Sequence, residues 1–438
     1  MKLRVQQVRK GFAFNSSSSH SIVFLKPGDV DTEAHDRGAD DYYGWEEFIL
    51  ATPEAKAKYF AAQFRHALAS SVGEQAATVV TSGYFGDPGL AGIDHQSVLS
   101  LPRFKDGSLA TEFIRDIFTS FIKNDAVGVI GGNDNGGDSL VEGRPDVFFP
   151  SSYKGMLARK EADGTWTTFD TGSGNKVRFT PDFLGNMRNR KSLTPELVDI
   201  KITDYCSFGC TFCYQGSTLK GKHASLASYK KLIDKLAELQ VFEVAIGGGE
   251  PTEHPDFLEM LQYAAEKKVV PNFTTRSTSW KHFKDIKDIV GGIGVSCDSL
   301  RDMQAKAKKF KEIGRATYQF IAGVTPQEEL EKISAHAAKE WLSLSLVGFK
   351  RTGRAGEPLP LDGDKLKKVL SEHIRELSVD ITFLQQYPMF DQIATCDTEE
   401  GRHSMYVDLV TKEMAKSSYC PERAPLKLDG LNEYFLSI

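Results

Sequence analysis

Apolar segments alternate regularly with amphipathic patterns in the second half of the chain. Six segments rich in β-branched and other apolar residues have the length of buried strands. They lie at residues 198–203, 242–247, 269–275, 293–297, 317–323 and 342–348. Residues 226–239 carry apolar side chains every three or four positions and lysines on the opposite face, which predicts a helix. This alternation predicts βα units with parallel strands, in either a doubly wound sheet or a partial barrel.

The first 185 residues lack this rhythm and predict a separate α+β domain. A helix is expected over residues 54–69, and alternating apolar and polar positions over 153–179 predict a β-meander. The glycine-rich run 128–138 has neither the lysine of a phosphate-binding loop nor the order G-x-G-x-x-G, so we expect a surface loop. The polar run at residues 15–20, Asn-Ser-Ser-Ser-Ser-His, predicts a solvated turn.

Composition narrows the class of protein. The chain has 438 residues, of which 40% are hydrophobic and 26% charged, which is typical of a globular protein with two or three domains. Its net charge of -5 gives no general attraction to nucleic acids. No apolar run approaches the roughly 20 residues that span a bilayer, and the first residues lack the apolar core of a signal peptide. We therefore expect a cytoplasmic protein with no membrane partner.

The cysteines carry the clearest chemical signal. Three of the six, Cys206, Cys210 and Cys213, follow directly after the first predicted strand of the βα region. Parallel α/β folds place their chemistry at this end of the strands. Three thiolates on one loop can hold three corners of a [4Fe-4S] cluster and leave one iron open to a further ligand. A structural zinc site is the weaker interpretation, because no second pair of ligands follows at the usual spacing.

This cysteine pattern, with Phe212 just before the last cysteine, resembles the CxxxCxxC loop of radical S-adenosylmethionine (SAM) enzymes. A second motif at the end of the next strand resembles the GGE motif of that family, whose backbone meets the amino group of the methionine moiety. Its residues are Gly247, Gly248, Gly249 and Glu250. The resemblance covers about residues 196–356. It implies a partial (β/α)6 radical SAM barrel over 190–385, an N-terminal α+β domain over 1–185 and a small C-terminal cap over 386–438.

The resemblance also implies an activity and its cofactors. A [4Fe-4S] cluster on the three cysteines binds SAM and, when reduced, cleaves it to a 5'-deoxyadenosyl radical that removes hydrogen from a substrate. The glycines suit this role because a side chain there would block the approach of the ligand to the backbone. A reducing partner such as flavodoxin or ferredoxin is expected.

Further candidates lie at the ends of the later strands. Thr275, Ser296 and Asp298 resemble positions that contact the cofactor, and Gln319 is a further cofactor-binding candidate because it could hold a carboxylate or phosphate group. Asp298 has two interpretations, since its carboxylate could accept the ribose hydroxyls or cap the helix that follows. Lys306 is expected with its neighbouring lysines on a solvent-facing helix surface.

The substrate is open between two classes. The C-terminal cysteines Cys396 and Cys420 resemble a reduced version of the SPASM extension, which binds auxiliary clusters in enzymes that modify peptides. Two cysteines cannot supply a full set of ligands, so a cap without an auxiliary cluster is predicted. This likeness favours a peptide or protein substrate.

Basic residues near the strand ends would equally suit the carboxylate or phosphate groups of a nucleotide or modified nucleobase. These residues are Arg276, Lys350, Arg351 and Arg354. A noncatalytic iron-sulfur or zinc protein is the alternative to an enzyme, but such a protein would not need the glycine-glutamate motif.

Overall fold

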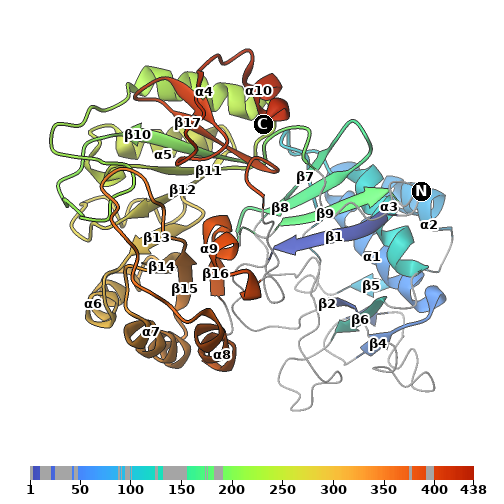
Figure 1. Cartoon of the computed structure of the whole chain (residues 1–438). Coiled ribbons are helices and arrows are strands. Elements are labelled where there is room, and N and C mark those ends of the chain that lie inside the picture. Colours follow the sequence, from blue (N-terminus) through green and yellow to red (C-terminus); the bar gives the residue numbers. More distant parts are fainter. Residues whose placement is uncertain are drawn as a thin grey trace. The chain divides into compact units, whose positions relative to one another are not determined.

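The computed structural model describes most of the βα region and parts of the N-terminal half. The described residues are 3–9, 21–24, 42–43, 48–86, 89, 91–93, 99, 101–123, 127–131, 155–172, 174, 176–181, 191–373, 377–390 and 399–438. The chain divides into two compact units, Met1–Arg188 and Asn189–Ile438, coloured blue to green and green to red in Figure 1. The polar run at 15–20 and Cys396 lie outside the described residues.

In its described residues, the first unit combines three helices with small sheets. Its helices are α1 (Pro53–Val72), α2 (Glu74–Phe85) and α3 (Thr111–Ile122). A four-stranded antiparallel sheet has the order β1 (Leu3–Arg9), β9 (Lys176–Pro181), β8 (Trp166–Asp170) and β7 (Met156–Lys160). A second sheet has the order β2 (Ser21–Phe24), β6 (Val127–Gly131) and β4 (Phe48–Leu50), and β3 (Tyr42–Tyr43) pairs with β5 (Gly92–Ile93).

The helix and the β-meander predicted from the sequence of this unit are both present. The predicted helix over 54–69 is α1, which Thr52 caps by accepting a hydrogen bond from the Ala55 N–H at 3.3 Å. The predicted meander over 153–179 is formed by β7, β8 and β9. The surface-loop prediction for 128–138 is wrong at its start, because residues up to Gly131 belong to β6, which pairs on both sides. The rest of that run lies outside the described residues.

The second unit is built on parallel strands in chain order. The strands are β10 (Leu197–Thr203), β11 (Glu243–Gly248), β12 (Val270–Thr275), β13 (Ile293–Ser296), β14 (Ala316–Ile321), β15 (Ser343–Val347) and β16 (Leu377–Val379). Each is parallel to the next. The six predicted strands are therefore confirmed, and β16 is an addition. The connecting helices are α4 (Leu226–Glu238), α5 (Phe257–Glu266), α6 (Leu300–Phe310), α7 (Gln327–Glu340) and α8 (Gly363–His373).

This strand order decides between the two predicted architectures. A doubly wound sheet reverses its order at a switch point, whereas β10 to β16 succeed one another without reversal. Since crossovers between parallel strands are right-handed, successive steps in one direction place the helices on one face of the sheet. Figure 1 shows α6, α7 and α8 side by side along the strands β13 to β15. The doubly wound alternative is excluded.

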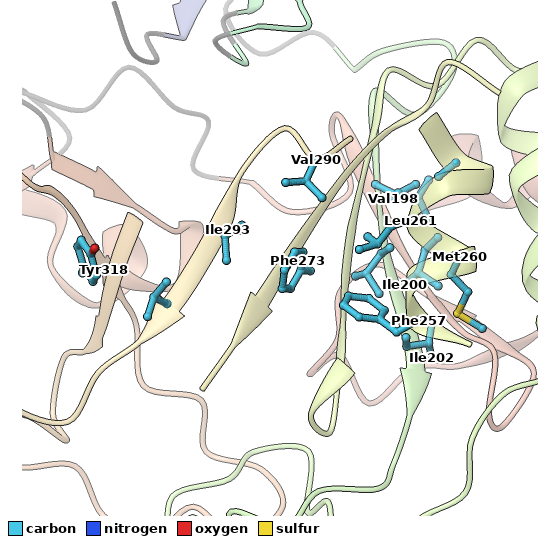
Figure 2. Close-up of a cluster of buried hydrophobic side chains, with 14 of the residues drawn as sticks. Val198, Ile200, Ile202, Phe257, Met260, Leu261, Phe273, Val290, Ile293 and Tyr318 are labelled. Carbon is cyan, nitrogen blue, oxygen red and sulfur yellow. The ribbon is translucent and has the colours of Figure 1, made fainter. Parts of the chain in front are cut away.

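The two faces of the sheet differ in polarity. Toward the helices, Val198, Ile200 and Ile202 of β10 join Phe257 and Met260 of α5 in the buried cluster of Figure 2. Side chains alternate between the faces of a strand, so the intervening residues occupy the other face. Those residues are largely polar and include Asp199, Lys201, Asn272, Thr274, Ser296 and Gln319. One face of the sheet thus packs into the hydrophobic core, and the other face carries polar and charged side chains.

Residues expected to form the C-terminal cap extend the sheet at its first strand. The strand β17 (Ser404–Asp408) lies parallel to β10 on the side opposite β11. It continues antiparallel into β18 (Glu413–Ala415) and β19 (Ala424–Pro425). Two short helices, α9 (Ile381–Gln386) and α10 (Leu431–Ser437), and the 3-10 turns η3 (Pro251–Glu253) and η4 (Pro388–Phe390) complete the unit. In the described part of the chain no helix combines the length and apolarity needed to cross a membrane.

Candidate metal and cofactor site

The three cysteines lie on the loop that leaves β10, here called the cysteine loop (residues 204–221). All three thiols are free and partly exposed. The loop folds back on itself, because the Cys206 N–H donates to the Thr218 carbonyl and the Thr218 N–H to the Asp204 carbonyl, both at 3.1 Å. Burial, with the nearby carboxylates of Glu250 and Glu253, raises the pKa of the Cys206 thiol. Cationic iron would therefore be needed to favour its thiolate.

The arrangement of the three thiols bears on whether they fit a cluster or a single metal ion. Among the described residues, no three His, Cys, Asp or Glu side chains are grouped as they would be around a single metal ion. A cubane cluster offers each thiolate its own iron, so its ligands need not converge on one point. Three free thiols on one partly exposed loop fit that demand better than they fit a mononuclear zinc site.

The glycine motif lies against the start of the cysteine loop. The Gly249 N–H donates to the Thr203 carbonyl at 2.7 Å, and the Glu250 N–H donates to the Tyr205 carbonyl at 3.0 Å. A Cβ on Gly249 would lie 2.0 Å from the Tyr205 carbonyl oxygen. Gly248 has a φ of +117°, and its Cβ would lie 2.3 Å from the Thr203 oxygen. These two glycines allow β11 to end directly against the chain that leads to Cys206.

Gly247 differs from the other two glycines. A Cβ there would meet no atom within 4 Å. A side chain at position 247 would therefore extend into space that a ligand could otherwise use to approach the backbone. At Gly248 and Gly249 a side chain would instead clash with the neighbouring backbone.

Glu250 ties the ends of two strands together. Its buried carboxylate accepts hydrogen bonds from the Thr252 and Thr275 hydroxyls at 2.7 and 2.6 Å and from the Arg276 N–H at 3.0 Å. The Thr275 hydroxyl in turn accepts from the Ser277 N–H at 3.0 Å. Both residues were predicted as cofactor contacts, and the structure places them in a network that joins β11 to β12.

Asp298 is paired with the arginine that follows β12. Its carboxylate forms a short ion pair with Arg276, whose guanidinium lies 5.5 Å from the centre of the Phe212 ring in the cysteine loop. The helix-cap interpretation of Asp298 is wrong, because Ser299 caps α6 by accepting from the Asp302 N–H at 3.2 Å. Arg276 therefore links the cysteine loop to the end of β13.

Ser296 and Gln319 are neighbours across β13 and β14. The Ser296 carbonyl accepts a hydrogen bond from the Lys306 ammonium at 2.6 Å, and Lys306 also pairs with Asp302 at 2.8 Å. Lys306 is only 6% exposed, so the expectation of a solvent-facing side chain is wrong. Its charge is tolerated in the interior because both partners replace lost water. The Gln319 amide lies across Gly294 on the polar face of the sheet.

The basic residues after β15 have partners of their own. Lys350 lies 3.4 Å from the Asp380 carboxylate and about 5 Å from the rings of Tyr214 and Tyr419. Arg351 is exposed and pairs with Glu357 at 2.9 Å. The third residue, Arg354, donates to backbone carbonyls of the cysteine loop. The positive charge that suggested a phosphate site is thus already engaged within the protein.

Residues 200–344, about a third of the chain, match the family model described as the radical SAM superfamily. We call these matched residues the radical SAM segment. It contains the cysteine loop, the glycine motif and the ends of five parallel strands.

Curated relatives are similar to part of the chain. Mycofactocin maturase MftC of Mycolicibacterium smegmatis is 27% identical over 177 residues, covering 36% of this chain and 45% of the relative. GTP 3',8-cyclase of Photorhabdus laumondii is 26% identical over 182 residues, covering 36% of this chain and 56% of the relative. The chain thus spans about half the length of these relatives.

Two solved structures with bound S-adenosylmethionine are also similar. Streptococcus suis SuiB bound to S-adenosylmethionine has a TM-score of 0.46 and 15% identity, covering 55% of this chain and 66% of that chain. Native anSMEcpe with bound AdoMet and Cp18Cys peptide has a TM-score of 0.43 and 14% identity, covering 56% of this chain and 81% of that chain. The assignment of the radical SAM segment itself comes from the family match.

Sequence analysis missed charged residues on the polar face of the radical SAM segment. Lys201 pairs with Asp204 and lies 3.2 Å from the Asp408 carboxylate of β17. Burial raises the pKa of Asp199 to about 6, and nearby Lys350 partly offsets this effect. The available signal was the presence of two charged residues within one buried strand, LVDIKIT.

Proposed function

We propose that this chain is a radical SAM enzyme in which Cys206, Cys210 and Cys213 hold a [4Fe-4S] cluster. One observation carries the proposal: three free thiols share one loop, directly after the first of the sequentially ordered parallel strands. The same loop is hydrogen-bonded to the glycine motif of the next strand. The proposal divides the chain into an N-terminal α+β domain (1–185), a partial (β/α)6 barrel (190–385) and a C-terminal cap (386–438).

The protein's own residues would position the cofactors. When bound, the cluster and SAM would supply a 5'-deoxyadenosyl radical able to remove hydrogen from an unactivated carbon. Gly247 leaves room for SAM to approach the backbone, and Gly248, Gly249 and Glu250 hold that backbone against the cysteine loop. Further SAM contacts are proposed at the strand ends from Thr275, Ser296, Asp298 and Gln319. Flavodoxin or ferredoxin would supply the electron.

A peptide or protein is the proposed substrate. The similarity to mycofactocin maturase supports this choice. The similarity to GTP 3',8-cyclase supports a nucleotide instead. However, Arg276, Lys350 and Arg354, which suggested phosphate binding, are paired with Asp298, Asp380 and backbone carbonyls. A nucleotide would have to break these contacts to recruit the same charges.

The cluster can be tested directly. Anaerobically reconstituted protein should contain one [4Fe-4S] cluster, and replacing Cys206, Cys210 and Cys213 together by alanine should abolish it. Iron and sulfide analysis with absorption spectra measures both. Wild-type iron and sulfide in the triple variant would disprove the ligand assignment.

Two further measurements separate the functional classes. Reduced, reconstituted protein should convert SAM to 5'-deoxyadenosine, whereas a noncatalytic iron-sulfur protein would hold the cluster and leave SAM intact. Deuterium transfer into 5'-deoxyadenosine from labelled peptides or from labelled nucleotides then distinguishes the two substrate classes.

A further inference from the structure

The segment that follows β15 packs on the cysteine loop, 130 or more positions away in the chain. The Arg354 N–H donates to the Cys213 carbonyl at 2.9 Å, and the Thr352 hydroxyl donates to the Tyr214 carbonyl at 3.1 Å. Gly353 has a φ of +62°, and a Cβ there would lie 2.4 Å from the Tyr214 oxygen. The backbone of this segment is therefore shaped to fit against the third cysteine.

The Arg354 side chain extends the contact to the second cysteine. Its Nη1 donates to the Ser217 carbonyl at 2.7 Å, while Nη2 and Nε donate to the Cys210 carbonyl at 3.2 and 3.3 Å. The planar fork of a guanidinium can bridge two carbonyls in this way, and a lysine ammonium cannot do so in the same geometry. One side chain thus fixes the distance between two points of the cysteine loop.

The charge of Arg354 is also directed at this loop. Within the described ranges no carboxylate forms an ion pair with Arg354, whereas the adjacent Arg351 pairs with Glu357 at 2.9 Å. A cation beside cluster ligands favours the more negative, reduced state of an iron-sulfur cluster.

We infer that Arg354 is a positioning residue for the cluster: its fork holds the Cys210 carbonyl at a fixed distance from the Ser217 carbonyl, and its charge raises the reduction potential. The inference rests on the proposed function, because it takes the three cysteines as cluster ligands. Its first part concerns the loop alone and holds for the protein before any cluster is inserted.

The test compares R354Q and R354K with the matched control R351Q. Hydrogen exchange of peptides covering residues 206–218 is measured in cluster-free, full-length protein. The R354Q and R354K variants should both exchange at least tenfold faster than wild type, because neither side chain bridges the two carbonyls. The R351Q variant should match wild type, since it removes a neighbouring exposed charge and its ion pair with Glu357 but keeps the Arg354 side chain.

The midpoint potential of the reconstituted cluster separates the role of charge from that of shape. R354Q should shift the potential to a more negative value, and R354K should restore it toward wild type because the charge is kept. Wild-type exchange in R354Q, or an equal change in R351Q, would overturn the positioning role. An unshifted potential in R354Q would overturn the electrostatic part.

The two proposals fail differently. If the wild-type protein takes up no cluster, the proposed function fails while the exchange experiment still decides whether Arg354 holds the loop. Circular dichroism of each variant shows whether it folds, and R354K serves as the informative variant if R354Q does not.

Discussion

Glycines at neighbouring positions of one motif have different physical roles. Gly249 has no room for a methyl group beside the Tyr205 backbone, whereas Gly247 faces open space. We therefore predict that G249A displaces the start of the cysteine loop and lowers cluster content. The G247V variant should keep its iron and sulfide but bind SAM at least tenfold more weakly. Iron analysis and titration of the cluster spectrum with SAM measure the two effects.

Each glycine variant serves as the control for the other, because both substitutions change the end of the same strand, β11. Loss of iron in G247V together with normal iron in G249A would contradict the assignment of roles.

Asp199 should make stability depend on pH in the weakly acidic range. Its pKa in the folded protein is raised to about 6, mainly by burial, while unfolded aspartates titrate near 3.9. The folded chain then binds more protons than the unfolded chain between about pH 4 and pH 6, so stability falls as pH rises through this range. D199N should reduce that fall. Urea midpoints at several pH values measure it.

Two neighbouring groups enter this experiment. Burial also raises the pKa of Glu400, which contributes in the same direction, and Lys350 opposes both shifts. An unchanged pH slope in D199N would show that Asp199 is ionised in the folded protein.

At the scale of elements, Asp380 joins a strand end to a helix start. One carboxylate oxygen accepts from the Gly348 N–H after β15 and from the Phe383 N–H of α9, both at 2.8 Å. The other faces Lys350 at 3.4 Å. D380A removes the cap and the ion pair together, so we predict a loss of about 2 kcal/mol in unfolding free energy. Chemical denaturation measures this loss.

The matching asparagine variant separates the two contributions. D380N keeps an oxygen that can accept from both amides and should lose less stability than D380A. Equal losses in both variants would show that the ion pair with Lys350, and not the cap, accounts for the effect.

Elements with a full pattern were predictable from the sequence. The six strands from β10 to β15 are rich in apolar and β-branched residues, and α4 has a clear helical period. The strand β16 was missed because three residues at the edge of the sheet carry a weak pattern. The strand β17 was missed although it is largely buried, because its partner β10 lies about 200 positions earlier in the chain. Lys306 was misplaced on a solvent face for a related reason: its burial depends on a carbonyl of another element.

At the scale of the whole molecule, the C-terminal thiols are expected to be structural. Burial raises the pKa of the Cys420 thiol, whose Sγ lies 2.9 Å from a Glu422 carboxylate oxygen, so the thiolate is disfavoured. We predict that replacing Cys396 and Cys420 together by alanine leaves iron content and SAM cleavage unchanged. Iron analysis and 5'-deoxyadenosine formation measure this. A loss of about half the iron would instead indicate an auxiliary cluster.

The sequence by itself determined the local features of this protein. Hydrophobic periodicity specified six strands and the helix over 226–239 in the second unit, and the spacing of Cys206, Cys210 and Cys213 placed three thiols on one loop. Both signals arise within a short window of residues, where side-chain direction follows from backbone geometry alone.

Only the tertiary structure decided which polar groups meet. It placed Arg354 on the Cys210 carbonyl 144 positions earlier, and it paired Lys350 with Asp380. It also showed that Gly249 packs on Tyr205 while Gly247 stays open. Such partners are brought together by the order and twist of the strands, and a buried charge accepts whichever partner packing provides, so no local pattern records the choice.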